Sequence, residues 1–292
     1  GLPVQRQIRR HRRDLIVVGA GDDVVVVDAG GPGVSVQTPA NLDPTRRSAR
    51  VTLEGAPATV LAGARRTFVD LARVILSAEA VGIARQCTDS AAEYAKVRQQ
   101  FGRPIAMYQA VKHHCANMVV ATELATSAVW DAARAAAKGG DQLTYAATVA
   151  ATLAGPAADL CANLNIQVHG GIGFTWEHDA HLYLRRATTL RALLDHQRAA
   201  EELTDLTRRG VRRARSVDLP PEAEPIRDEV RAFAEGITGT DAAAQRAALI
   251  ETGYVMPHWP KPWGREAGAV EQLVIEQEFE RALSFTERFL RR

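Results

Sequence analysis

A long alanine-rich tract from Arg65 to Arg209 constrains the fold of this chain more than any other feature. Alanine is the strongest helix former, and few prolines interrupt the tract. Apolar side chains recur at spacings of three and four, as in the stripe Phe68, Leu71, Val74, Ala78 and Val81. Glycine-containing breaks at 101–104, 139–141 and 169–173 divide the tract. This pattern predicts four long helices with short connections, which form an antiparallel bundle.

The segment before the tract has a strand-like pattern. β-Branched runs at 15–18 and 24–27 are separated by a turn-rich stretch, and further short strands are predicted at 33–37 and 49–53. The sequence LIVVGAG at 15–21 is similar to a dinucleotide-binding turn, but that motif needs a third glycine and a following helix. Here Gly21 is followed by two aspartates and another strand, so we expect a β-hairpin.

The composition changes again after the tract. A basic cluster from Arg208 to Arg215 leads into a proline-rich stretch at 219–225, which predicts a linker. Neither this cluster nor the one from Arg6 to Arg13 has interleaved aromatic residues, so both are interpreted as solvated chain. Residues 226–292 are helical in pattern and contain an aromatic loop at 253–264. The final helix has no stop signal, so we expect this chain to be a window from a longer one.

Composition and charge exclude several classes of protein. A net charge of +2 argues against a general nucleic-acid binder, and no apolar run approaches the roughly 20 residues that cross a bilayer. Cys87, Cys115 and Cys161 are too scattered for a disulfide framework, which predicts a reducing, cytoplasmic setting. His178 and His181 share a helical face, but exposed polar groups at a helix start explain them better than a metal does. We therefore expect no metal site.

Two stretches stand out as candidate sites. The first, Tyr94 to Ile105 with Gln109 after it, gathers an arginine, amide side chains and an aromatic ring that suit a phosphate and a flat ring. The second, Gln167 to Thr175, has three glycines in four positions, which let backbone N–H groups approach an anion closely. On these residues alone, each stretch is equally a loop between two helices, and Gln109 is equally an exposed helix residue.

These stretches resemble two motifs of the acyl-CoA dehydrogenases, flavoproteins that desaturate acyl-CoA thioesters. RQQFG at 98–102 resembles the family's RxxFG segment, and QVHGG at 167–171 resembles its QxxGG segment. The resemblance implies a mainly α fold with a β portion, in which a four-helix bundle follows part of a β-barrel domain. The implied domains are a partial middle β-domain at 1–62, the C-terminal four-helix FAD-binding domain at 63–210, a linker at 211–225, and a partial N-terminal helical domain of a second module at 226–292.

The resemblance also implies the cofactor FAD and the residues that bind it. In the family, the RxxFG arginine contacts the FAD pyrophosphate, the phenylalanine packs by the adenine end, and the QxxGG backbone holds FAD across a dimer interface. In this chain the cofactor-binding roles fall to Arg98, Gln100, Phe101, Gln109, Gln167, Gly170 and Gly171. A planar guanidinium fork suits a diphosphate better than the point charge of lysine does.

The family's usual catalytic base is missing from this chain. Desaturation needs a carboxylate that takes the α-proton while the flavin accepts a hydride. Leu194 occupies the position of the usual glutamate, and Ala72 occupies the alternative position on the first helix of the domain. Asp195 is the remaining catalytic candidate. We expect a partner to supply the base, because the run at 170–187 resembles non-catalytic subunits of heteromeric actinobacterial dehydrogenases of sterol side-chain breakdown.

The sequence thus predicts part of an FAD-dependent acyl-CoA dehydrogenase that acts on acyl-CoA thioesters, including bulky or steroid side-chain ones. Its expected partners are the acyl-CoA substrate, a second dehydrogenase module or subunit in a homo- or hetero-oligomer, and an electron-transfer acceptor. Two alternatives remain. One is a cofactor-free helical scaffold that stabilises a partner, and the other is an acyl-CoA oxidase with the same fold.

Overall fold

The computed structural model describes residues 14–46, 48–213 and 219–282. The chain divides into two compact units, 1–214 and 215–292. The basic cluster from Arg6 to Arg13 and the end of the predicted final helix lie outside the described residues.

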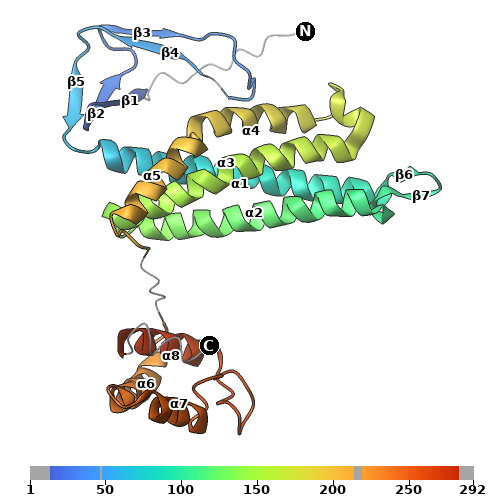
Figure 1. The fold of residues 1–292 in the computed structure, drawn as a ribbon. Coiled ribbons are helices and arrows are strands. Elements are labelled where there is room, and N and C mark those ends of the chain that lie inside the picture. The colour runs from blue at the N-terminus through green and yellow to red at the C-terminus, as the bar shows by residue number, and fades with distance from the viewer. Residues whose placement is uncertain (1–13, 47, 214–218, 283–292) are drawn as a thin grey trace. The chain divides into compact units, whose positions relative to one another are not determined.

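The alanine-rich tract folds into an antiparallel bundle, as predicted (Figure 1). Its helices are α1 (Arg65–Val97), α2 (Gln109–Ala136), α3 (Gly140–His169), α4 (Ala180–Leu194) and α5 (His196–Arg208), with short helical turns η1 (Ile105–Met107) and η2 (Gly170–Phe174). The fourth predicted helix is two helices, because Asp195 adopts a left-handed backbone with φ 43°. The Asp195 carboxylate accepts a hydrogen bond from the Arg198 N–H and so begins α5.

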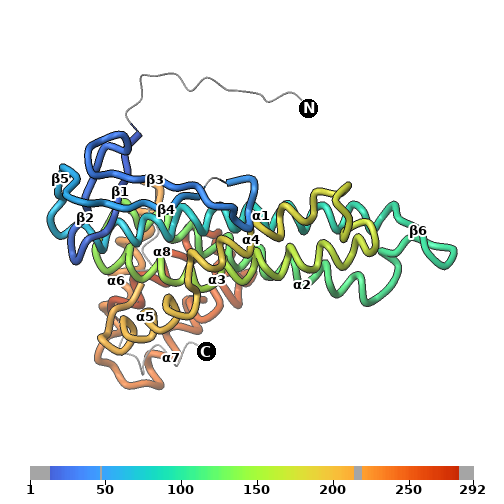
Figure 2. Tube along the Cα trace, turned by 90° about the horizontal axis from the view of Figure 1, so that it is seen from above, coloured from blue at the N-terminus to red at the C-terminus, as the bar shows by residue number. Residues whose placement is uncertain are grey.

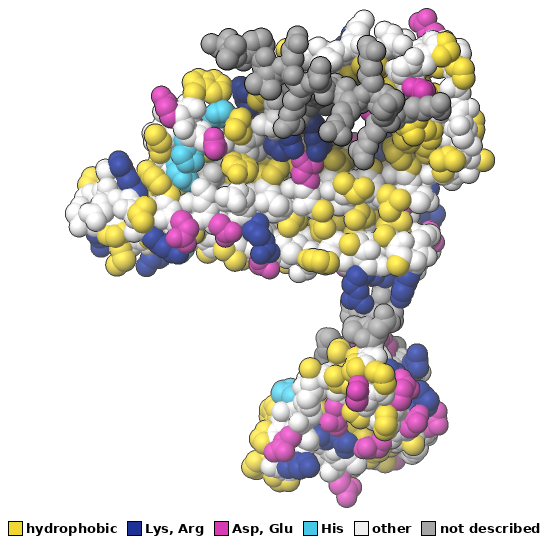
Figure 3. All heavy atoms as spheres, turned by 180° about the vertical axis from the view of Figure 1, so that it is seen from behind, with side chains coloured by type: hydrophobic (Ala, Val, Ile, Leu, Met, Phe, Trp, Pro, Cys, Tyr) yellow, Lys and Arg dark blue, Asp and Glu magenta, His cyan; other side chains and the backbone are white. Residues whose placement is uncertain are grey.

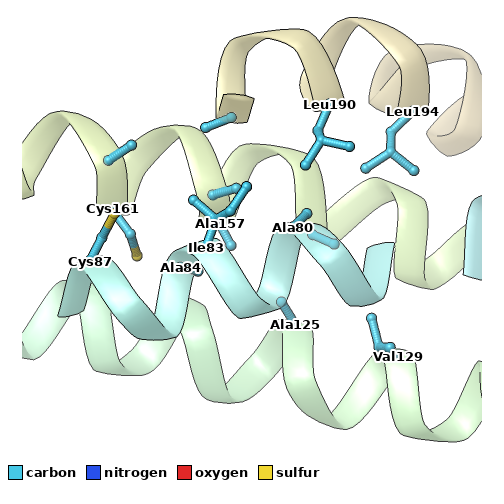
Figure 4. Packing of buried hydrophobic residues seen from close by; sticks show 14 of the residues in the cluster. Ala80, Ile83, Ala84, Cys87, Ala125, Val129, Ala157, Cys161, Leu190 and Leu194 are labelled. Carbon is cyan, nitrogen blue, oxygen red and sulfur yellow. The ribbon is translucent and has the colours of Figure 1, made fainter. Parts of the chain in front are cut away.

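Small side chains form the centre of the bundle (Figure 4). On α1 the buried face carries Ala80, Ala84 and Ala91, which meet alanines of α2 and α3 such as Ala125 and Ala154. The predicted α1 stripe is only partly a core face, because Phe68 and Leu71 are 36% and 41% exposed. Val74 and Val81 of the same stripe do pack against the core. Small residues occupy the buried positions because they let the helix axes come close together.

Two charged residues on the buried face of α1, Asp70 and Arg73, have polar partners on other helices. The Thr144 hydroxyl donates to the Asp70 carboxylate at 2.6 Å, and the Arg73 guanidinium donates to the Glu202 carboxylate at 2.8 Å. Asp70 and Arg73 are buried between α1, α3 and α5. Pairing offsets the desolvation that would otherwise exclude these side chains from the interior.

The segment before the bundle forms two small antiparallel sheets. One sheet has the order β1 (Leu15–Ala20), β2 (Asp23–Asp28) and β5 (Ala58–Leu61), and the other pairs β3 (Val34–Gln37) with β4 (Arg50–Leu53). The predicted hairpin is confirmed, because Ala20 pairs with Asp23 and leaves a two-residue turn. The strands at 33–37 and 49–53 are also confirmed, whereas β5 was not predicted.

An ion-pair cluster fastens the chain before the bundle to α1 and α4. The Arg186 guanidinium of α4 donates to Asp43, Glu79 and Thr45, and Arg46 donates to Glu79 as well. Asp43 is almost completely buried. A cavity of about 540 Å³ lies beside this cluster, with Ile83, Leu182 and Tyr183 among its apolar lining residues.

The predicted linker is partly bound to the bundle. Arg213 donates two hydrogen bonds to the Asp131 carboxylate of α2, at 2.8 and 2.9 Å. For this arginine, the interpretation of the basic cluster as solvated chain is therefore wrong. Residues 214–218 lie outside the described part of the chain.

The second unit consists of α6 (Ala223–Ile237), α7 (Ala242–Glu251) and α8 (Ala269–Ala282). Its core contains the rings of Tyr254 and Phe279, whose centroids are 5.4 Å apart. The buried Glu278 accepts hydrogen bonds from Arg227 and Arg231. The aromatic loop therefore contributes Tyr254 to the core of this unit.

Within the described ranges, the helices lack the length and apolar character that a membrane crossing needs. The same residues contain no group of three or more histidine, cysteine, aspartate or glutamate side chains that could hold a metal ion.

Candidate cofactor site

The two candidate stretches lie at one end of the bundle. The Tyr94 ring, in the last turn of α1, stacks on the His169 imidazole at the end of α3, with centroids 4.2 Å apart and planes at 26°. Figures 1 and 2 show the hairpin after α1 at the opposite end of the bundle from the β1–β2–β5 sheet. The fold thus joins two segments that are far apart in the sequence.

The first stretch forms a small hairpin that the sequence pattern did not predict. Strands β6 (Gln99–Gln100) and β7 (Arg103–Pro104) are joined by Phe101 and Gly102, both with positive φ, at 52° and 78°. A two-residue turn of this kind favours glycine, and a phenylalanine held there is strained. The Tyr108 hydroxyl donates to the Gln100 carbonyl at 3.1 Å and braces the hairpin. As a result the Phe101 ring is 91% exposed.

The second stretch ends α3 and turns into η2. His169 is buried, and its Nδ1 lies 2.8 Å from the Asn165 carbonyl oxygen. Gly173 packs directly against this turn, since a Cβ there would lie 2.8 Å from the Ile166 carbonyl oxygen and 3.0 Å from the His169 Cβ. The backbone at Gly170 and Gly171 is open by contrast, with no atom within 4 Å of a Cβ built there.

The donor groups at this end suit an extended anionic cofactor such as FAD. The side chains of Arg98, Gln100, Gln109 and Gln167 are exposed. Across the described residues, Arg98 makes no ion pair, so its guanidinium is available to a diphosphate. The Gln100 side-chain amide donates a hydrogen bond to the Gln99 carbonyl at 2.8 Å. With the exposed Phe101 side chain and the open glycine backbone, these residues fit FAD in chemical type.

Residues at the expected positions of the base have ordinary structural roles. The Leu194 side chain is 2% exposed in the bundle core, and Ala72 is half-buried on α1. Asp195 is exposed and caps α5. The Asp195 carboxylate is thus used by the helix cap, and its catalytic role stays a prediction.

Sequence reasoning missed one residue of this site. His169 lies inside the QVHGG stretch, but its contact is with Tyr94 of α1, which is far away in the sequence. A local pattern cannot predict such a contact. An imidazole at the end of a helix, before a run of glycines, was the only available indication.

The comparisons with known proteins match the helical tract to a known family. Residues 63–209 match the family model of the acyl-CoA dehydrogenase C-terminal domain. The acyl-CoA dehydrogenase FadE34 of Mycobacterium tuberculosis is 45% identical over 274 residues, which are 90% of this chain and 38% of that protein. This chain therefore spans well under half the length of that relative.

Two solved structures are similar as well. The Tcur3481-Tcur3483 steroid ACAD aligns with a TM-score of 0.62 and 29% identity over 67% of this chain and 55% of that one. The ChsE4-ChsE5 complex from Mycobacterium tuberculosis aligns with a TM-score of 0.58 and 26% identity, over 66% of this chain and 54% of that one. The expected mainly α fold with a β portion is confirmed. The family match covers half of the chain, and it includes both motifs of the candidate site. This chain belongs to the acyl-CoA dehydrogenase family.

Proposed function

We propose that this chain is part of an FAD-dependent acyl-CoA dehydrogenase that α,β-desaturates bulky acyl-CoA thioesters, steroid side-chain thioesters among them. The observation that carries the proposal is the meeting of the 98–102 and 167–171 stretches at one exposed end of the bundle, through the Tyr94–His169 stack. The names of its relatives, which include a steroid ACAD, support the substrate class.

In this proposal the chain contributes cofactor binding. The Arg98 guanidinium holds the pyrophosphate, Phe101 contacts the adenine end, and Gln100, Gln109 and Gln167 donate hydrogen bonds from their amides. The backbone of Gly170 and Gly171 approaches the cofactor where no Cβ stands in the way. When bound, FAD supplies the capacity to accept a hydride from the substrate.

A second dehydrogenase module or subunit completes the site in this proposal. Phe174 and Trp176 follow the 167–171 stretch and are 88% and 74% exposed, and large apolar side chains exposed together favour a protein contact. Figure 3 shows further hydrophobic side chains at the surface along the bundle. The partner supplies the carboxylate base that positions 72 and 194 lack, and residues 226–292 begin the N-terminal helical domain of a second module.

The absorbance spectrum of the purified full-length protein tests the proposal. Bands near those of an oxidised flavin, released as FAD on denaturation, are the expected result. A colourless protein that binds no added FAD would instead favour the cofactor-free scaffold. Reduction of an artificial electron acceptor without peroxide formation distinguishes a dehydrogenase from an acyl-CoA oxidase.

A further inference from the structure

Arg103 is a cation at the candidate cofactor site that the RQQFG motif at 98–102 does not include. It lies on β7, in the hairpin at the far end of the bundle (Figure 1). The residue is exposed, and across the described part of the chain its guanidinium makes no ion pair and no side-chain hydrogen bond. The guanidinium lies over the Tyr108 ring, with its carbon 4.4 Å from the ring centroid. Its N–H donors are therefore available to an anion.

The register of the hairpin places Arg103 beside Arg98. Gln100 pairs with Arg103, and the Ile105 N–H donates to the Arg98 carbonyl at 2.8 Å, so Arg98 lies opposite Ile105. Cross-strand partners share a face of a hairpin, and so do residues two apart on extended backbone, such as that at Arg98. Arg98, Gln100 and Arg103 thus share one face, with the two arginines as diagonal neighbours. Diagonal positions lie about 7–8 Å apart, a distance that long side chains span.

The charge around the hairpin suits an anion with two negative charges. The sequence has no aspartate or glutamate from 94 to 122, and the preceding Glu93 accepts a hydrogen bond from Lys96 at 2.6 Å. The two arginines therefore meet no carboxylate from their own segment. Each guanidinium presents planar N–H donors that match the oxygens of a phosphate group. Two of them on one face fit a diphosphate, the group that links the two halves of FAD.

Tyr108 contacts the hairpin from the start of α2, where it is the residue before the first helical position. Its ring lies under the Arg103 guanidinium, and its hydroxyl donates to the Gln100 carbonyl at 3.1 Å. The same ring meets Phe101 edge-on, with centroids 6.4 Å apart and planes at 88°. A cation held over an aromatic ring has fewer conformations to lose when a ligand binds. Tyr108 thus prepares Arg103 for the contact.

We propose that Arg103 is a further cofactor-binding residue, which holds the FAD diphosphate together with Arg98, and that Tyr108 is a positioning residue for Arg103. The proposal rests on the proposed function for its ligand, FAD. It extends the site beyond the RQQFG motif to β7 and to the start of α2.

The first test is the affinity of the full-length protein for FAD and for ADP, which carries a diphosphate without the flavin. Arg103→Ala should weaken the binding of both about tenfold or more, because a charge-assisted contact is lost. Its FAD affinity should also depend less on ionic strength than that of the wild type, since one cation fewer meets the diphosphate. The matched control Arg134→Ala removes an exposed arginine from α2 and should bind both ligands as the wild type does. Unchanged affinities in Arg103→Ala would overturn the role of Arg103.

A double-mutant cycle tests the positioning role of Tyr108. Tyr108→Leu removes the ring and should weaken FAD binding about threefold, the size of an exposed cation–π contact. In the Arg103→Ala background the same change should have no further effect, whereas a merely structural role would cost as much in both backgrounds. Tyr108→Phe keeps the ring under Arg103 and should keep most of the affinity. Equal losses from Tyr108→Leu in the two backgrounds would refute the positioning role.

The two ligands separate this proposal from the proposed function. If the wild type binds FAD and Arg103→Ala binds it equally well, only the Arg103 proposal fails. If the wild type binds ADP but not FAD, the cofactor assignment fails, and the arginine pair is judged by the ADP affinity of Arg103→Ala. A wild type that binds neither ligand would contradict both.

Discussion

The Asp43 carboxylate, almost completely buried before the bundle, accepts a hydrogen bond from the Arg186 guanidinium of α4. Arg186 also donates to Glu79 of α1, so one guanidinium ties three segments of the chain together. This contact fixes the strand segment on the bundle.

Removal of the Asp43 carboxylate should destabilise this unit. Asp43→Ala leaves the half-buried Arg186 with fewer partners, and breaking a buried ion pair costs about 3 kcal/mol. Denaturant unfolding of the variant measures this loss. Asp89→Ala removes an exposed carboxylate from α1 and should leave stability within about 0.5 kcal/mol of the wild type.

The same ion pair predicts a loss of stability in acid. Burial raises the pKa of Asp43, but hydrogen bonds from Thr45 and Arg186 outweigh it and hold the pKa below the ordinary value of 3.8. The carboxylate therefore stabilises the fold fully above that ordinary value, and the contribution is lost as pH falls through the folded-state pKa. Unfolding measured from pH 7 to pH 2.5 should show a smaller acid loss in Asp43→Ala than in the wild type. Equal losses in both would refute the role of this carboxylate.

The alanine face of α1 gives a third prediction. Ala84→Leu places extra methyl groups where the helices approach, and overpacking of this kind costs about 1–3 kcal/mol. Ala78→Leu makes the same change on the exposed side of α1 and should leave the unfolding free energy nearly unchanged. Comparable losses in the two variants would mean that the buried face has been wrongly identified.

Helix α1 also shows what a sequence pattern can and cannot predict. The glycine-containing breaks and the alanine content were enough to predict the helical bundle. The β-branched runs were enough to predict the hairpin at 15–28. The side of α1 that faces the other helices could not be predicted, because the partners of the buried Asp70 and Arg73 lie on α3 and α5, far away in the sequence. The stripe of Phe68 and Leu71 is apolar but exposed, a pattern that periodicity alone cannot distinguish from a core face.

For the candidate site, the sequence indicated the two stretches but not how they meet. The local residues Arg98 and Gln167 could be chosen from motifs, whereas the Tyr94–His169 stack depends on the packing of α1 against α3. The exposed turn at Phe101 depends likewise on a hairpin of four paired residues, too short to give a strand signal.

The cysteines should differ sharply in reactivity. Burial raises the pKa of Cys87 to about 12, with a smaller contribution from Cys161, and Cys161 is itself fully buried. Cys115 is only half-buried. A thiol reagent should label Cys115 first in the native protein and reach Cys87 and Cys161 only on unfolding. Rapid native labelling that survives in Cys115→Ser would contradict this order.

Asp195 can be tested separately as a catalytic base. Asp195→Asn keeps a side-chain oxygen for the α5 cap and tolerates the left-handed backbone, so stability should hardly change. Because we assign the base to a partner, turnover of an acyl-CoA thioester by the full-length protein should stay within about twofold of the wild type. A loss of about a hundredfold or more in turnover, with the fold intact, would assign the base to Asp195.

FAD retention in an Arg98 variant tests the central claim most directly. Arg98→Ala in the full-length protein should weaken FAD binding about tenfold or more, since a charge-assisted fork on a diphosphate is lost, with little change in thermal stability. Arg98→Lys should recover only part of the affinity. Arg134→Ala, which removes an exposed arginine from α2, should retain the wild-type FAD content. An Arg98→Ala protein that keeps full FAD occupancy and affinity would contradict the account.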